Sequence, residues 1–399
     1  MPLTFRSRRS LLVAAGATAC IAALPPAAGA KAVKAPAGNG FYSAPAKRVA
    51  GSPGSVIWQR KVTTGPVHLS NSARTTLILY RSRSVSGKPI AVSGTVDIPK
   101  GKAPKGGFKV ISYAHGTTGM ADVCAPSRNK TSAPAYGYIA YTDAMLNRWL
   151  KKGYAIVRTD YEGLGTPGDH PYLIGNSAGR GVVDIVQAAR KVDGRLSKSY
   201  VIAGHSQGGQ AALFAAQGAS KWARSLSLKG TLAFAPASHI FEQKSLLPGL
   251  TSPSGLSGLA VMILTSAARQ EGRDPADFLS AQADAFLPQL DTVCTAQINE
   301  PDSFGGLAPA SLLAFDDGSL DDTLKAMNPA VKATGPIAML QGESDTTVFK
   351  FLTDQLRDEL VAKKNKLEYK TYPGLDHSGV VINDKSQGDA TAWIAARLR

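Results

Sequence analysis

Residues 200–213 have the sequence YVIAGHSQGGQAAL, and this stretch decides the fold. The apolar run at 200–203 predicts a buried strand, and residues 207–217 predict a helix that ends at Gly218. Between them lies Gly-x-Ser-x-Gly, centred on Ser206. A strand that turns directly into a helix strains the residue at the bend and exposes its side chain above the sheet. The pattern predicts a nucleophilic Ser206, and the competing interpretation is a glycine-rich turn that only packs closely.

A nucleophilic serine that attacks a carbonyl also needs donors for the negative oxygen that forms. The backbone N–H of Gln207, at the start of the predicted helix, is one candidate. A second candidate lies in the turn at 115–119, HGTTG, which follows a predicted strand at 108–113. The sequence leaves open whether Thr117 or Thr118 supplies that N–H, and an ordinary β-turn is the alternative for this turn.

Strands and helices alternate along most of the chain. A hairpin is predicted at 75–98, and buried strands are predicted at 154–159, 230–234, 336–340 and 367–372, with helices between them. Short links and alternation indicate an α/β fold with a mostly parallel sheet covered by helices on both faces. The alternation breaks at 238–333, where turns and amphipathic segments predict a helical cap or lid. The core would then comprise 55–237 and 334–399.

A serine hydroxyl needs a base, and the base needs a carboxylate to orient it. In this architecture the chain order is serine, acid, histidine, each on a loop at a strand's carboxyl end. Asp345 follows the predicted strand at 336–340, and His377 follows the strand at 367–372. We therefore expect Asp345 to be the acid and His377 the base, with Glu343 as a competitor for the acid.

The N-terminus has the pattern of an export signal. Residues 1–30 combine a basic start, an apolar segment too short to span a bilayer and a small-residue cleavage site. The sequence SRRSLL at 7–12 also resembles a twin-arginine leader. A lipoprotein anchor at Cys20 is the minor alternative. We therefore expect a secreted protein without a transmembrane segment.

Residues 31–54 are rich in Ala, Pro, Gly and Lys, and this composition predicts a flexible segment between the leader and the core.

Removal of the leader leaves two cysteines, Cys124 and Cys294. An isolated pair in an oxidising compartment predicts one disulfide, which would close a long loop and stabilise the fold by at most about 5 kcal/mol. No Cys or His spacing suggests a metal site, and no cofactor is expected.

The formal charge of +16 includes three leader arginines. It indicates either a solvated basic surface or attraction to anionic surfaces, and no pattern for nucleic-acid binding is present.

Several further motifs carry a family resemblance. They are YAHGT at 113–117, CAPS at 124–127, DYEGLG at 160–165, HPY at 170–172, SAGR at 177–180 and GHSQGG at 204–209. Together they resemble the secretory lipase family of α/β-hydrolases over about residue 55 to the end. The resemblance implies a helical lid and hydrolysis of carboxylic esters, often acylglycerols, by a triad at Ser206, Asp345 and His377. The turn at 115–118 departs from the fungal members.

We therefore expect the partner to be a small-molecule acyl ester or a lipid, and we expect transient contact with a lipid interface. A serine peptidase or amidase on the same fold is the alternative enzyme class. A secreted binding protein that kept the fold without the chemistry is the alternative outside enzymes. Acyl-chain length and oligomeric state lie beyond the sequence.

Overall fold

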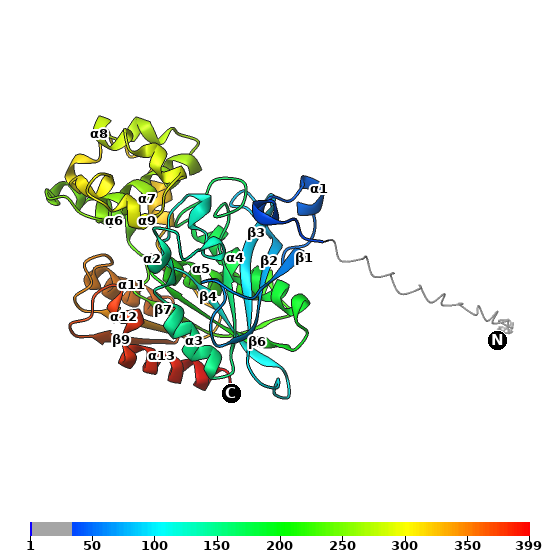
Figure 1. The fold of residues 1–399 in the computed structure, drawn as a ribbon. Helices are drawn as coiled ribbons and strands as arrows, with labels where there is room; N and C mark the ends of the chain where they lie inside the picture. The colour runs from blue at the N-terminus through cyan, green and yellow to red at the C-terminus, as the bar shows by residue number, and fades with distance from the viewer. Residues whose placement is uncertain (2–33) are drawn as a thin grey trace. The chain divides into compact units, whose positions relative to one another are not determined.

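One sheet of nine strands organises the part of the chain that the computed structural model describes, which is Met1 and residues 34–399 (Figure 1). The predicted leader therefore falls outside the described residues apart from Met1, as does Cys20. The sheet order is β1-β2-β3-β5-β4-β6-β7-β8-β9. The strands are β1 (Val56–Val62), β2 (Ser72–Arg83), β3 (Pro89–Pro99), β4 (Phe108–Ala114), β5 (Ala155–Thr159), β6 (Leu196–His205), β7 (Ser227–Phe234), β8 (Ile337–Gly342) and β9 (Leu367–Tyr372).

Strands β4 to β9 pair in parallel, and β1 to β3 add an antiparallel edge that contains the predicted hairpin. The residues of β4 alternate between two hydrophobic clusters: Val110 packs into one, and Ile111 and Tyr113 into the other. Because helices cover both faces of such a strand, nearly every position is apolar. This is why short apolar runs located the parallel strands in the sequence.

The helices lie on both faces of the sheet and above one edge of it. Apolar residues of α4, α5 and α11 pack on one face, and those of α3, α12 and α13 pack on the other. The bounds are α1 (Ala46–Val49), α2 (Tyr136–Ala140), α3 (Asp143–Lys151), α4 (Gly175–Val192), α5 (Gln207–Trp222), α6 (Ile240–Lys244), α7 (Leu256–Gln270), α8 (Ala281–Asp284), α9 (Thr295–Ile298), α10 (Asp321–Ala326), α11 (Lys350–Ala362), α12 (Gly379–Ile382) and α13 (Asp384–Arg397). None of these helices is both long and apolar enough to cross a bilayer.

Helix α5 does not end at Gly218, as its sequence suggested, but continues to Trp222. A Cβ at position 218 would lie 2.3 Å from an atom of the Trp222 ring. The glycine therefore makes room for an aromatic side chain one turn later. A glycine in a helix is unfavourable by about 1 kcal/mol, which tertiary packing can offset.

The segment at 31–54, for which flexibility was predicted, contains ordered elements within its described part, residues 34–54. From Gly38 on it forms a short 3-10 helix (Gly38–Tyr42) and α1, and the side chains of Phe41 and Tyr42 are buried. The Trp58 indole donates a hydrogen bond to the Phe41 carbonyl at 2.8 Å, and the Tyr42 hydroxyl donates to the Ser127 carbonyl at 3.0 Å. Two aromatic side chains thus anchor a segment whose overall composition is typical of a linker.

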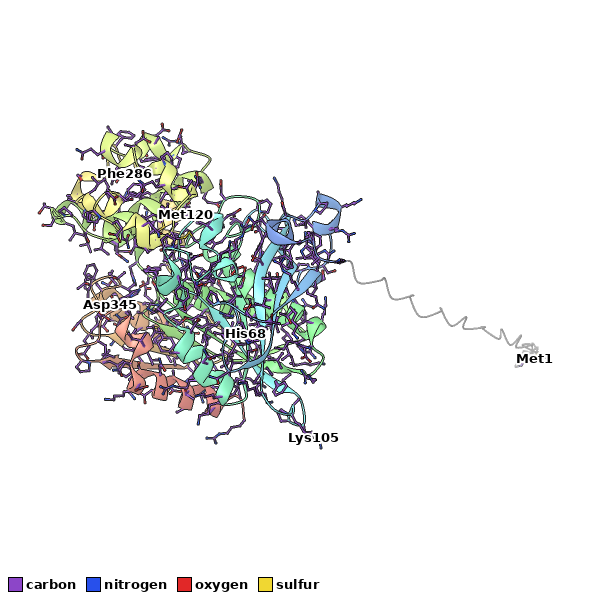
Figure 2. The ribbon with its side chains drawn as sticks, viewed as in Figure 1. Met1, His68, Lys105, Met120, Phe286 and Asp345 are labelled. Carbon is purple, nitrogen blue, oxygen red and sulfur yellow. A yellow bond between two sulfur atoms is a disulfide. The ribbon has the colours of Figure 1, made fainter. Side chains whose placement is uncertain are left out.

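The residues between β7 and β8 contain α6 to α10 and no strand of the large sheet. We call residues 238–333 the cap. It has a hydrophobic cluster of its own, and Met120 of the core joins that cluster at the junction of the two parts (Figure 2). The apolar residues at 278–287 do not share one helix: they lie in or beside three short helical turns, at 275–278, 281–284 and 287–291, of which the first and last have a proline in their first turn.

The predicted disulfide between Cys124 and Cys294 is present, with the two Cα atoms 5.4 Å apart. It joins the loop after β4 to the start of α9. The N–H of Thr295 also donates to the Thr118 carbonyl at 3.0 Å. One side of the cap is therefore fixed covalently beside the turn at 115–119.

Candidate active site

Ser206 lies at the bend between β6 and α5, with φ 58° and ψ −119°. This left-handed backbone conformation is unfavourable for a residue with a side chain. The turn is also tight: a Cβ at Gly204 would lie 2.0 Å from the Gly208 carbonyl oxygen, and one at Gly208 would lie 2.0 Å from the Ala114 carbonyl oxygen. The two glycines of the pentapeptide are thus required by close backbone approach.

His377 and Asp345 form a hydrogen-bonded pair at the carboxyl ends of β9 and β8. The His377 Nδ1 donates to Asp345 Oδ2 at 2.8 Å. The other carboxylate oxygen accepts from the N–H groups of Thr347 and Val348, both at 2.8 Å, and Gln341 Nε2 donates to Oδ2 at 3.0 Å. The buried carboxylate therefore accepts hydrogen bonds from several donors, and the donation from Nδ1 leaves His377 Nε2 as the acceptor nitrogen of the neutral ring.

Glu343, the competing acid in the sequence, takes no part in this pair. It is exposed, and its carboxylate accepts a hydrogen bond from the Thr371 hydroxyl at 2.6 Å. Only Ser344 separates it from Asp345, yet the Glu343 side chain makes a surface contact.

Ser206 and His377 line the same cavity, which has a volume of about 530 Å³. The hydrogen bonds of residues 34–399 do not include one between the Ser206 hydroxyl and the His377 imidazole. Catalytic hydrogen bonds are often long in unliganded proteins and shorten when substrate binds. The structure thus places the two side chains on one cavity wall without a direct bond between them.

His205 connects the serine turn to the histidine loop. The Tyr141 hydroxyl bonds to His205 Nδ1, and His205 Nε2 bonds to the backbone carbonyl of His377 at 2.9 Å. A carbonyl only accepts, so Nε2 must carry the proton and Nδ1 must accept from Tyr141. Burial, and then electrostatic interaction with the neighbouring His377 imidazole, lower the pKa of His205 well below its usual range, so His205 stays neutral.

Sequence reasoning missed the contacts of His205 with Tyr141 and with the His377 loop. The only signal was the position of His205 next to Ser206, because its partners are 64 and 172 residues away in the chain.

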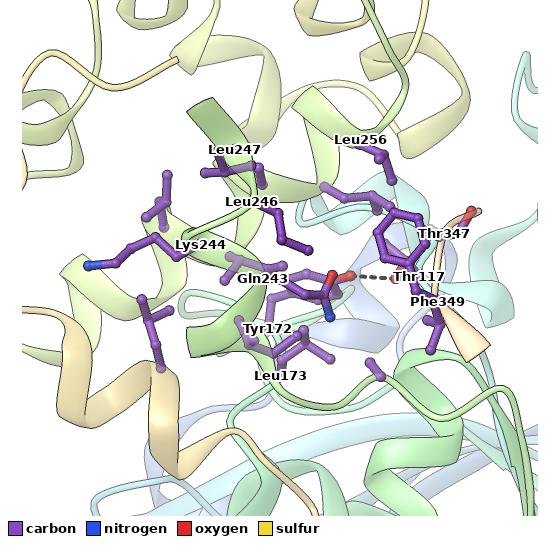
Figure 3. Close-up of a pocket in the computed structure, with 18 of the residues that line it drawn as sticks. Thr117, Tyr172, Leu173, Gln243, Lys244, Leu246, Leu247, Leu256, Thr347 and Phe349 are labelled. Carbon is purple, nitrogen blue, oxygen red and sulfur yellow. Dashed lines mark hydrogen bonds between the residues drawn. The ribbon is translucent and has the colours of Figure 1, made fainter. Parts of the chain in front are cut away.

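The two oxyanion candidates near the strand ends differ in their surroundings. Thr117 lines the cavity beside Ser206, and its hydroxyl shares a hydrogen bond with the Tyr172 hydroxyl at 2.6 Å (Figure 3). The Thr118 carbonyl is bonded to Thr295 of the cap, and Thr118 does not line the cavities on which Ser206 lies. These surroundings favour Thr117 over Thr118.

Gln207 is held by a buried network beneath the turn. Its side-chain Nε2 donates to His170 Nε2 at 3.0 Å, and His170 Nδ1 donates to the Glu162 carbonyl at 2.8 Å. Burial lowers the pKa of His170 to about 4, although the bond to Glu162 opposes this shift. The first N–H of α5, that of Gln207, has no acceptor within its own helix and is free for a ligand oxygen.

Ser206 and Thr117 also line a second cavity, which has mostly aliphatic walls (Figure 3). The cap supplies many of its side chains, including Leu246, Leu247 and Leu256, and the core supplies Leu173, Val348 and Phe349. An apolar cavity that opens at a strained serine can hold a hydrocarbon chain next to the reacting group.

A parallel sheet with a strained serine after one strand and an acid–histidine pair after two later ones defines the α/β-hydrolase fold. Solved structures with this fold superpose on most of the chain. Candida antarctica lipase A matches with a TM-score of 0.70 at 20% identity, covering 84% of this chain and 80% of that one. The rice cell wall degrading esterase LipA from Xanthomonas oryzae matches with a TM-score of 0.71 at 16% identity, covering 88% and 100%.

The sequence identifies the family. The secretory lipase family model matches residues 131–399, so the chain belongs to the secretory lipase family. It is 26% identical over 380 residues to a probable inactive lipase of Mycobacterium tuberculosis, covering 91% of this chain and 82% of that protein. It is 30% identical over 167 residues to Lipase 6 of Candida albicans, covering 40% of this chain and 34% of that protein. The chain thus spans about a third of the length of Lipase 6.

Proposed function

We propose that the protein is a secreted lipase or esterase that hydrolyses carboxylic esters through an acyl-enzyme on Ser206. The observation that carries the proposal is the His377–Asp345 pair at 2.8 Å, with His377 on the wall of the cavity that also holds Ser206. The strained turn and the aliphatic cavity support it. Membership of the secretory lipase family supports both the chemistry and an extracellular location.

In the proposed mechanism His377 Nε2 removes the proton from the Ser206 hydroxyl as its oxygen attacks the ester carbon. The protonated imidazole then gives this proton to the leaving alkoxide, and Asp345 stabilises its charge. The N–H groups of Gln207 and Thr117 would bind the negative oxygen. A water activated by His377 then releases the acid and restores Ser206.

The proposal extends to the chain's organisation. Residues 1–30 would be an export signal, read by the twin-arginine or the general route. Residues 238–333 would act as a lid, since the cap supplies much of the wall of the aliphatic cavity. No cofactor takes part in this mechanism.

Ser206→Ala tests the proposal directly. We expect the variant to fold and to lose hydrolysis of p-nitrophenyl butyrate by about 10⁴-fold or more, because removal of a catalytic serine leaves only residual catalysis. Stability is checked by thermal unfolding. Undiminished turnover in Ser206→Ala would overturn the assignment.

Two further measurements separate the alternatives. Failure of a fluorophosphonate to label Ser206 in the wild type would favour a binding protein, an outcome to which the "probable inactive" relative gives weight. A butyryl anilide cleaved faster than the matched butyrate ester would favour an amidase.

A further inference from the structure

Ser206 lies where two cavities with different linings meet. One is the aliphatic cavity beneath the cap. The other, of about 530 Å³, has a mixed lining, and we call it the polar cavity because hydrogen-bonding side chains set it apart from the first. These side chains belong to Tyr138, Ser254, Asn299, Asp376 and Ser378, while Leu256 and Leu259 line both cavities. This volume falls within the range of ligand pockets, about 300–1,000 Å³.

The position of His377 decides which part of an ester enters each cavity. The imidazole that takes the serine proton must hand it to the oxygen of the departing alcohol, so that alcohol lies on the histidine side. His377 lines the polar cavity and is absent from the lining of the aliphatic one. If Ser206 and His377 act as proposed, the acyl chain enters the aliphatic cavity and the alcohol enters the polar cavity.

The polar cavity offers hydrogen-bonding groups that the protein itself leaves largely unused. Among the side-chain hydrogen bonds of residues 34–399, none involves Tyr138, Asn299 or Ser378, and Asn299 Oδ1 is a buried atom without a partner. Asp376 uses one carboxylate oxygen to accept the Gly379 N–H at 2.6 Å, and its other oxygen has no partner there. Donors and acceptors thus stand together on the alcohol side of the serine.

We propose that the preferred substrate is a monoester of a small polyhydroxylated alcohol, such as glycerol or a sugar alcohol, with one aliphatic acyl chain. The free hydroxyls of the alcohol would bind Asn299, Asp376 and Ser378. A triacylglycerol fits this division less well, because two of its acyl chains would have to cover the hydrogen-bonding groups of Asn299, Asp376 and Ser378 without pairing them. The inference rests on the proposed function and narrows its substrate class.

An acyl-transfer competition tests the inference. The wild-type protein is acylated with p-nitrophenyl butyrate in the presence of equal concentrations of glycerol and 1-propanol, which share a three-carbon skeleton. The two butyrate esters are quantified by chromatography and corrected for the number of primary hydroxyls. One or more hydrogen bonds in the polar cavity should favour transfer to glycerol by about 3- to 10-fold.

Variants locate the preference. Asn299→Leu should lower the glycerol-to-propanol ratio several-fold. Tyr138→Phe removes a single hydroxyl from an exposed tyrosine and should lower the ratio less. Because Tyr138 is exposed, this second variant is the less disturbing to the fold. Leu247→Asn, in the aliphatic cavity, is the matched control: it should change the preference for donor chain length and leave the acceptor ratio as in the wild type.

A wild-type ratio near one, or a ratio that neither Asn299→Leu nor Tyr138→Phe changes, would overturn the substrate inference and leave the hydrolase intact. Absence of p-nitrophenol release from the wild type is a different result. It would overturn the proposed function, and the substrate inference with it.

Discussion

The core and the cap place residues at the site in different ways. Ser206, Asp345 and His377 follow strands β6, β8 and β9 of one sheet, and the backbone N–H groups of Thr347 and Val348 hold the carboxylate of Asp345. The cap contributes aliphatic side chains from short helices and turns, joined to the core by a disulfide. The comparison teaches that the sheet fixes the three side chains to which we assign the reaction, whereas the cap supplies much of the wall of the aliphatic cavity beside Ser206. Changes in the two parts should therefore have different consequences.

The largest effect is expected from a change in the core. Asp345→Asn keeps the shape of the side chain but removes the charge that orients His377 and stabilises its protonated form. We expect kcat for p-nitrophenyl butyrate to fall by about 10³- to 10⁴-fold, as when the acid of a serine triad is neutralised.

Glu343→Gln is the matched control for this variant, because Glu343 lies two residues away and faces solvent. Its kcat should stay within a factor of about two of the wild type, since a surface hydrogen bond contributes little. Equal losses in the two variants would contradict the placement of the acid.

The next effect concerns the junction of core and cap. In the Cys124→Ser, Cys294→Ser double variant the 170-residue loop is open. We expect a loss of about 2–4 kcal/mol in the free energy of unfolding, measured in urea, because the unfolded chain gains freedom. Limited proteolysis should cut the cap before the core.

Val123→Ser, at an exposed neighbouring position, controls for the added hydroxyl and should change stability by less than about 0.5 kcal/mol. Cleavage that begins in the core of the double variant would show that the disulfide does not act on the cap in particular.

The smallest effect concerns the buried network beneath the serine turn. The pKa of His170 is about 4 when folded and about 6.5 when unfolded, so folding favours its neutral form. Above pH 6.5 His170 is neutral in both states and does not lower the free energy of unfolding. As the pH falls from 6.5 toward 4, the unfolded chain binds a proton that the folded protein does not, so the free energy of unfolding decreases. At pH 5 the loss amounts to about 2 kcal/mol.

His170→Gln can keep one acceptor for Gln207 and one donor for the Glu162 carbonyl without titrating. Its melting temperature should therefore fall less than that of the wild type between pH 7 and pH 5. His115, whose pKa burial also lowers to about 4, should preserve part of the acid sensitivity. Parallel melting curves for the two proteins would contradict the assigned role of His170.

The core could be predicted from the sequence because its signals are local. Apolar runs mark strands buried on both faces, and the glycines around Ser206 mark a close approach of backbone. The chain order of nucleophile, acid and base then located Asp345 and His377 at strand ends.

The features that the sequence did not reveal depend on partners distant in the chain. Gly218 was taken as a helix end because the Trp222 ring above it could not be foreseen. Phe41 and Tyr42 find their burial against β1 and the loop after β4. The short turns of the cap lack a regular period, since tertiary contacts and proline set their limits. Whether Thr117 or Thr118 faces Ser206 depends on how the cap binds that turn.

His205 joins the turn that carries the proposed nucleophile to the loop that carries the proposed base. It donates to the backbone carbonyl of His377 and accepts from Tyr141, so a shift of either loop is transmitted to the other. Gly116 belongs to this linkage, because a Cβ there would lie 2.8 Å from the Tyr141 hydroxyl and 3.4 Å from His205 Nδ1. A methyl group at position 116 would therefore displace Tyr141 and His205. Because His205 is bonded to the main chain of His377, the His377 imidazole would move relative to Ser206, although position 116 is remote from it in sequence.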